Sequence, residues 1–310
     1  MVISQKSEIE SPPIVETWRL PAVLWAMACL LIQIPALENR SFEPDEGLRV
    51  YCARELLRDR TPYRDFWDHK DPTEWLLCAG LMLLFGDSLS GLRLGINVLR
   101  AALVYHVCGL GQQARVGKNA WLTGGLATVL LIAEPIQGNT SAIEIPALLL
   151  FVLAMRLVTK ICCNGHSKAR VLPGQPAPDL PRSSGEGPLP QNLVLPVLAG
   201  VLSGFAVLLK PTTAVAGLPA LILLCRNDLV RRLIGMAVGM GAALGMVLSW
   251  CLTKGIVSDW FFVMAVYNPS YSRGTPHWEY LSGVVPPRLF FLLPFVLLAV
   301  VGFLEQKKSD

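Results

Sequence analysis

Residues 43–75 read EPDEGLRVYCARELLRDRTPYRDFWDHKDPTEW, and this stretch decides how the rest of the chain is interpreted. Acidic, basic and aromatic side chains crowd together in it, whereas the segments on both sides are strongly apolar. In so hydrophobic a chain, such a cluster is either a solvated loop or a site. We interpret it as a functional site.

Composition places the chain among polytopic membrane proteins. Of its 310 residues, 53% are hydrophobic and only 16% are charged, against roughly 25% charged residues in soluble domains. Long apolar runs recur along the chain, as expected of membrane-spanning helices. The net charge of +4 comes from basic residues spread among the loops, so nucleic-acid binding is not expected. The cysteines show neither a disulfide framework nor metal-ligand spacing.

The apolar runs predict an all-α fold in a single domain with about eight transmembrane helices. Residues 1–18 are expected to form a cytoplasmic tail, and residues 161–191, rich in Pro, Gly and Ser, a flexible cytoplasmic loop. GxxxG motifs at 235–239 and 241–245 predict close helix packing in one span. The expected spans are residues 20–37, 88–111, 119–135, 142–158, 192–209, 211–225, 232–253 and 288–304.

Two amphipathic juxtamembrane helices are expected between the first two spans. The first runs from Glu46 to about Leu57. The second begins at the sequence Asp71–Glu74, where a capping acid, a proline and a glutamate three residues after the cap signal a helix start. It ends at Gly86 and is too short for a comfortable crossing, which takes about 20 residues.

The positions of Lys and Arg decide where this second helix lies. If residues 72–86 crossed the membrane, the basic groups of nearly every later loop would fall outside, against the positive-inside rule. We therefore predict that this helix lies along the outer surface, with both chain ends cytoplasmic and residues 38–87 extracytoplasmic. The polar stretches that then share the outer face are 38–72, 136–144, 210–213 and 254–287.

Three short motifs carry a resemblance to a known family. Asp45-Glu46, Pro62–Phe66 (PYRDF) and His69–Pro72 (HKDP) resemble the GT-C superfamily of integral-membrane glycosyltransferases. Within this superfamily, the chain most resembles the family 39-type branch. This branch contains protein-mannosyltransferase-like enzymes together with bacterial aminoarabinose transferases and rhizobial galacturonosyl transferases. It covers roughly residues 20–287 and includes FGDSLSGLRL, LLKPTTA and VYNPSY. Asp71 stands where the family usually has proline, and many relatives continue beyond eight spans.

The resemblance implies an inverting glycosyltransferase of the plasma (inner) membrane with an extracytoplasmic active face. It would move a sugar from a polyprenyl-phosphate-linked donor to a lipid, glycan or protein acceptor, with no metal or other cofactor. The expected partners are this donor, the lipid bilayer and, as a further candidate, a membrane partner subunit. Two alternatives stay open: a truncated, non-catalytic binder of lipid-linked sugar, and a transporter of lipid-linked saccharide, although no internal repeat is found.

Each main candidate residue also has a purely structural alternative. The resemblance makes Asp45 the base that accepts the acceptor's hydroxyl proton, whereas the alternative is a helix N-cap. Glu46 would assist Asp45 or bind sugar hydroxyls, unless it is a first-turn acid favoured by the helix dipole. Lys70 would bind the donor phosphate, or be a solvated or headgroup-binding lysine. Lys210 would also meet this phosphate, or snorkel to the interface.

Further candidates are weaker. Arg93 and Arg100 fall within a span, so at least one is expected to be buried and paired. Glu43 lies close to Asp45 and Glu46, but we assign no metal to these acids. The remaining donor-phosphate candidates are His69 and Arg273, and the sugar or acceptor candidates are Tyr63, Trp67, Asn139, Glu144 and His277.

Overall fold

The computed structural model describes residues 18–38, 44–113, 120–132, 142–166, 191–212 and 229–273. Within these ranges the fold is all-helical, as predicted. The expected spans at 211–225 and 288–304 lie almost wholly or wholly outside them. The helices are α1 (Arg19–Ile32), α2 (Ile34–Leu37), α3 (Pro44–Leu57), α4 (Pro72–Phe85), α5 (Leu89–Gln113), α6 (Ala120–Ile132), α7 (Glu144–His166), α8 (Gln191–Leu209), α10 (Leu229–Thr253), α11 (Val257–Phe261), the π-helix η4 (Phe262–Tyr267) and α12 (Asn268–Arg273).

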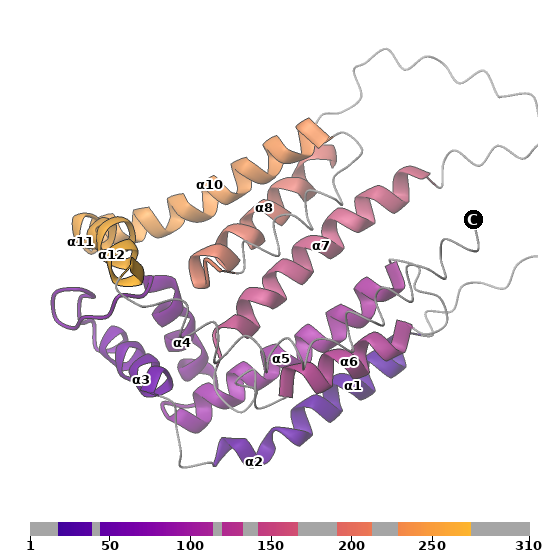
Figure 1. The fold of residues 1–310 in the computed structure, drawn as a ribbon, viewed down its shortest axis with the longest axis horizontal. Coiled ribbons are helices and arrows are strands. Elements are labelled where there is room, and N and C mark those ends of the chain that lie inside the picture. Colours follow the sequence, from indigo (N-terminus) through magenta and orange to yellow (C-terminus); the bar gives the residue numbers. More distant parts are fainter. Residues whose placement is uncertain are drawn as a thin grey trace, which may run out of the picture.

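The long helices form a bundle, and most of the short ones gather at one end of it (Figure 1). Two contacts show that α1 and α5 run in opposite directions. Trp18, just before α1, contacts Tyr105 in the second half of α5, and Ser90 at the start of α5 donates to the carbonyl of Leu37, which follows α1 at the end of α2. We call the end with α3, α4, α11 and α12 the polar end. The basic end is the opposite one, where α1 begins with Arg19 and α10 begins near Arg231 and Arg232.

Charge is divided unequally between the two ends. Within the described ranges, every Asp and Glu belongs to the polar end: those of residues 38–87, and also Glu144 and Asp259. The charged side chains described at the basic end are arginines. The four polar stretches that were predicted to share one face therefore do meet at one end of the bundle, as far as they are described.

Two of the described helices are long and apolar enough to cross a membrane, judged by length and composition: Leu89–Gln113 and Val230–Thr253. Shorter apolar helices lie at Arg19–Ile32, Pro72–Phe85, Leu122–Ile132 and Leu193–Leu209. The arrangement with eight spans stays a prediction.

Several predicted boundaries were wrong. α3 begins at Pro44, two residues earlier than expected, so Asp45 lies in the first helical turn instead of capping it. α7 continues to His166, so the first residues of the expected loop 161–191 are helical. The expected loop 254–287 contains helix in its described part, from Val257 onward. Pattern reasoning missed these helices because the segment is short and rich in aromatics.

A buried ion pair ties three helices together at the polar end. Arg93, near the start of α5, donates from Nε to Glu46 Oε1 at 2.9 Å and from Nη2 to Glu46 Oε2 at 2.7 Å. Its Nη1 also donates to the carbonyl of Ala36 in α2, at 2.9 Å. The Glu46 and Arg93 side chains are 0% and 3% exposed. The expectation of a buried, paired arginine is thus confirmed, and the partner is named.

Glycines let α8 and α10 approach closely, as the first GxxxG motif predicted. A Cβ added to Gly239 would collide with the backbone of α8, and one added to Gly200 would collide with the backbone of α10 at Met236. Among the described residues, a Cβ at Gly241 or Gly245 would meet nothing within 4 Å, so the second motif stays a prediction.

Loss of the buried arginine should destabilise the protein strongly. Arg93→Ala leaves the Glu46 carboxylate buried without its cation, which costs about 3–5 kcal/mol in other proteins. The free energy of unfolding in mild detergent should fall by about this amount. Arg58→Ala is the matched control, since Arg58 forms an exposed ion pair with Glu55, and its loss should change stability by no more than about 1 kcal/mol. Equal effects would contradict the anchoring role of Arg93.

Candidate functional site

The polar end brings Asp45 and Lys70 together. Lys70 Nζ lies 3.1 Å from Asp45 Oδ1 and 3.9 Å from Asp68 Oδ2. The Lys70 ammonium is buried and ion-paired, and it makes no hydrogen bond of good geometry with the residues that the structure describes. Asp45 is the solvent-facing member of the pair, with 52% of its side chain exposed. The Asp45 carboxylate thus faces solvent, and the Lys70 ammonium lies on its buried side.

Two further cations act on Asp45. Arg49, one turn further along α3, has its Nη2 3.8 Å from Asp45 Oδ2. Lys210 follows the end of α8 and is close enough to contribute electrostatically. Partial burial raises the pKa of Asp45, but Lys70, Arg49 and Lys210 together outweigh this effect and hold the pKa below its usual value. Asp45 is therefore ionised at neutral pH.

A second layer of carboxylates balances these cations. Arg49 Nε donates to Glu74 Oε1 of α4 at 2.6 Å, and both side chains are buried. Lys210 Nζ lies 2.8 Å from Glu144 Oε1 at the start of α7. Arg49 and Glu74 were not among the predicted site residues. The spacing of four between Asp45 and Arg49, which places them on one helix face, was the signal that could have found the arginine.

Glu46 has a different surrounding from its neighbour Asp45. Both of its oxygens accept hydrogen bonds from Arg93, and its side chain is fully buried. Both carboxylate oxygens are therefore already engaged where they lie. The structure places Glu46 as an anchor between α3 and α5.

The loop between α3 and α4 is held in a fixed conformation that positions Lys70. Tyr63 adopts a left-handed conformation with φ of 65°, and its hydroxyl donates to the Lys70 carbonyl at 2.8 Å. The rings of Tyr63 and Phe66 each lie 5.5 Å from the ring of Trp75 in α4. Tyr63 is thus part of the support under Lys70, with its hydroxyl turned toward the backbone.

Residues after α10 hold the same loop from the other side. Trp260 Nε1 donates to Asp71 Oδ2 at 2.9 Å, and Asn268 Nδ2 donates to the His69 carbonyl at 2.9 Å. Asp71 also caps α4 by accepting from the Thr73 amide. These contacts join segments nearly 200 residues apart in sequence, which is why no local pattern indicated them.

Aromatic rings meet where the loop before α4 contacts η4. The Trp67 and Tyr267 rings meet edge to face at 5.0 Å, and His69 lies 6.4 Å from Tyr267. The His69 ring is fixed by Asp68, whose Oδ1 lies 3.0 Å from His69 Nδ1. Half of the Trp67 surface is exposed. Trp67 and His69, both predicted, therefore lie close together, and Tyr267 and Asp68 join them.

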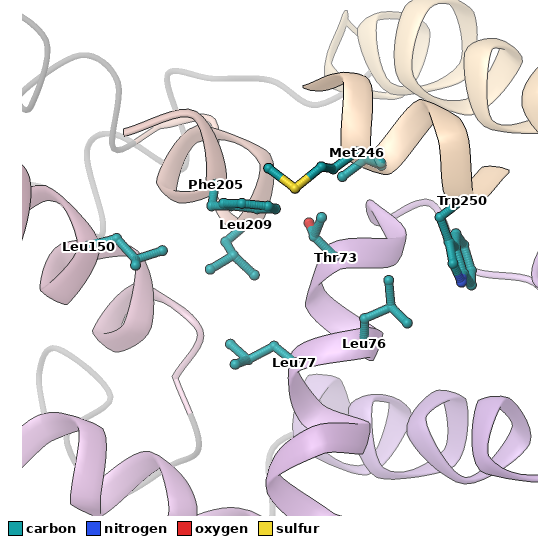
Figure 2. A pocket seen from close by; sticks show the side chains of 9 residues that line it. Thr73, Leu76, Leu77, Leu150, Phe205, Leu209, Met246 and Trp250 are labelled. Atoms are coloured by element: carbon teal, nitrogen blue, oxygen red, sulfur yellow. The ribbon is translucent and has the colours of Figure 1, made fainter. Parts of the chain in front are cut away.

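An apolar cavity of about 360 Å³ lies among α4, α7, α8 and α10 (Figure 2). Thr73 in the first turn of α4 belongs to its lining, and the Thr73 hydroxyl donates to Asp71 Oδ1, which joins one part of the lining to the charged loop. The cavity is lined by Thr73, Leu76, Leu77, Leu150, Phe205, Leu209, Met246, Val247 and Trp250.

Some predicted site residues cannot be placed. Asn139 and His277 lie outside the described residues, and the side chain of Arg273 is not described although its backbone ends α12. Among the described residues, no group of three or more His, Cys, Asp or Glu side chains is arranged to hold a metal ion.

The buried carboxylate of Asp71 gives a test of the loop's anchoring. Burial raises the pKa of Asp71 despite its hydrogen bonds with Thr73 and Trp260. A raised folded pKa means that stability falls as the pH rises from the unfolded value of about 3.9 through the folded value. Asp71→Asn keeps the helix cap but removes both the charge and the oxygen that accepts from Trp260. The loss of this acceptor is the same at every pH, so the thermal midpoint of the variant relative to that of the wild type should rise between acid and pH 7.

Asp71→Ala is the companion variant, because it removes the cap as well as the charge. It should cost about 0.5–2 kcal/mol of stability. A thermal midpoint of Asp71→Asn that falls relative to that of the wild type between acid and pH 7 would show that the charge itself holds the loop.

The comparisons with known proteins find no relative. No family model matches the chain, and neither the curated proteins nor the solved structures searched give a match. What this arrangement does is therefore inferred from its own chemistry.

Proposed function

We propose that the chain is a membrane glycosyltransferase that uses a polyprenyl-phosphate-linked sugar and acts at the extracytoplasmic face. The observation that carries the proposal is the Asp45–Lys70 pair: a half-exposed, ionised carboxylate 3.1 Å from a buried ammonium. A sugar phosphate donor needs both groups close together. The cation stabilises the leaving phosphate, and the carboxylate accepts the proton of the acceptor hydroxyl.

The apolar cavity supports a donor that carries a lipid. Its lining includes Thr73, three residues after Lys70 in sequence, and its other lining residues are hydrophobic. An isoprenoid chain lying in this cavity would bring its phosphate to the start of α4. Lys210, at the end of α8, is a second cation for that phosphate, since it lies within electrostatic reach of Asp45.

The basic residues of the short loops support the orientation. The polar end also carries arginines and lysines, but Arg115, Lys118, Arg226 and Arg231 lie in or beside loops that the arrangement with eight spans places inside, where Lys and Arg are retained in membrane proteins. In the proposed arrangement of eight spans, α4 lies at the outer surface with α3, and the polar end faces away from the cytoplasm.

In the proposed mechanism, donor binding releases the base. The donor phosphate takes the place of Asp45 beside the Lys70 ammonium, which frees the Asp45 carboxylate to face the acceptor. The acceptor oxygen then attacks the anomeric carbon, the bond from this carbon to the phosphate oxygen breaks, and the hydroxyl proton passes to Asp45. Attack from the face opposite the phosphate inverts the anomeric configuration.

Cysteine labelling tests the orientation. Asp59 at the polar end has 87% of its side chain exposed, and Arg231 is exposed at the basic end. In a cysteine-free background, Asp59→Cys should react with a membrane-impermeant maleimide in intact cells. Arg231→Cys should react only after the membrane is permeabilised. The opposite pattern would reverse the orientation and place the Asp45 cluster in the cytoplasm.

Asp45→Asn tests the role of the base. This change keeps the size of the side chain but removes the proton acceptor, so turnover should fall by about 10²–10⁴-fold. Donor affinity should be kept or should increase, because Asp45 no longer competes with the phosphate for Lys70. Sugar transfer from a synthetic polyprenyl-phosphate donor measures the first effect, and equilibrium binding of the same donor measures the second.

Two variants complete this test. Asp87→Asn removes an exposed carboxylate that pairs with Arg54 and should leave turnover unchanged. Lys70→Met should weaken donor binding about ten- to hundredfold, the usual value of a hydrogen bond to a charged group. Normal turnover in Asp45→Asn would reject the base. Wild-type protein that binds the donor but never transfers sugar would instead indicate a binder of lipid-linked sugar.

A further inference from the structure

A second cavity, of about 350 Å³, lies between α5, α7 and α8, away from the Asp45–Lys70 pair. Its wall combines polar groups with three leucines. Arg156 in its wall is close to Trp18, next to the start of α1, which places the polar side of the cavity toward the basic end. The lining residues are His106, Gln113, Leu153, Arg156, Leu157 and Leu202.

The arginine in this cavity is held in place by several neighbours. Arg156 Nη1 lies 2.6 Å from His106 Nδ1, and the guanidinium carbon lies 5.5 Å from the centre of the Trp18 ring. Gly109 of α5 makes room for it, since a Cβ there would lie only 2.6 Å from the guanidinium carbon. A cation stacked on an aromatic ring in this way is stabilised by the ring face.

The polar groups of the cavity are donors. Because Arg156 donates to His106 Nδ1, the imidazole is neutral and carries its proton on Nε2, which makes that nitrogen a donor. Gln113 Oε1 lies 2.9 Å from the Thr159 hydroxyl, whose single proton also has the Met155 and Arg156 carbonyls as neighbouring acceptors. The amide nitrogen of Gln113 carries two protons, so Gln113 keeps a donor in either orientation of its amide. Among the described residues, no carboxylate lines the cavity, and all carboxylates belong to the polar end. A set of donors with a net positive charge suits an anion.

We infer that this cavity binds the phosphate group of an anionic phospholipid from the cytoplasmic leaflet. The planar guanidinium of Arg156 matches two phosphate oxygens, and His106 and Gln113 supply further donors. Leu153, Leu157 and Leu202 provide an apolar wall for the start of an acyl chain, which a free phosphate ion would not need. Basic pockets between helices on the cytoplasmic side bind such head groups in other membrane proteins. The inference rests on the proposed membrane placement but not on sugar transfer.

Native mass spectrometry of the purified full-length protein tests this site. Phosphatidylglycerol of one defined chain length is titrated into protein stripped of lipid, and the fraction that keeps one bound lipid is measured. Arg156→Gln should weaken this binding at least tenfold. Arg231→Gln, which removes an exposed arginine from the basic end, should leave it unchanged. Leu202→Trp fills the apolar side of the cavity without altering charge, and it should weaken binding similarly.

Three results would overturn the inference. The first is wild-type affinity in both Arg156→Gln and Leu202→Trp. The second is an equal loss of binding in Arg231→Gln, which would indicate nonspecific attraction to the basic end. The third is displacement of the lipid by millimolar inorganic phosphate, which would identify a site for the free anion. Because the measurement is binding, a protein inactive in sugar transfer still gives a decisive result.

Discussion

The polar end depends on the buried contact between Glu46 and Arg93. Removing two charges from water costs several kcal/mol per ion, and only good geometry with additional hydrogen bonds repays that cost. Here the Arg93 guanidinium donates two parallel hydrogen bonds to the Glu46 carboxylate and a third to the Ala36 carbonyl, and these bonds offset the cost. The contact fixes the rotation of α3 about its own axis. Adjacent residues of a helix point in different directions, so Asp45 must face elsewhere, and it faces Lys70.

The two acids of the Asp45-Glu46 sequence thus have separate tasks. One is fully buried and holds the helix, whereas the other is half-exposed and surrounded by cations. A similar division holds in the next helix, where Asp71 caps α4 and Glu74 pairs with Arg49. The capping-box pattern predicted the helix start correctly, yet its glutamate bonds across to α3. Local signals located the helices, and tertiary contacts determined what the side chains do.

The fold class and the site could be predicted from the sequence to different depths. Apolar runs gave the helices, and the Asp71–Glu74 pattern gave the start of α4 within a residue. The basic residues predicted that four distant polar stretches meet at one end. The partner of Arg93 could not be predicted, because a buried ion pair between distant segments leaves no periodic trace. The hydrogen bond from Trp260 to Asp71 could not be predicted for the same reason. The helices after α10 were missed because their aromatic residues show no clear helical period.

The glycine contact between α8 and α10 has a mechanical consequence for the apolar cavity. The backbones touch at Gly200 and Gly239, whereas Phe205, Met246 and Trp250 line a cavity further along the same two helices, toward the polar end. The close contact continues to Gly204, where an added Cβ would lie 2.8 Å from the Cβ of Ala243. The spacing of α8 and α10 is therefore set by glycines just before the two helices line the cavity. A methyl group added at Gly200 or Gly239 would push α8 and α10 apart and so alter the cavity from about one to two helical turns away, without touching its lining.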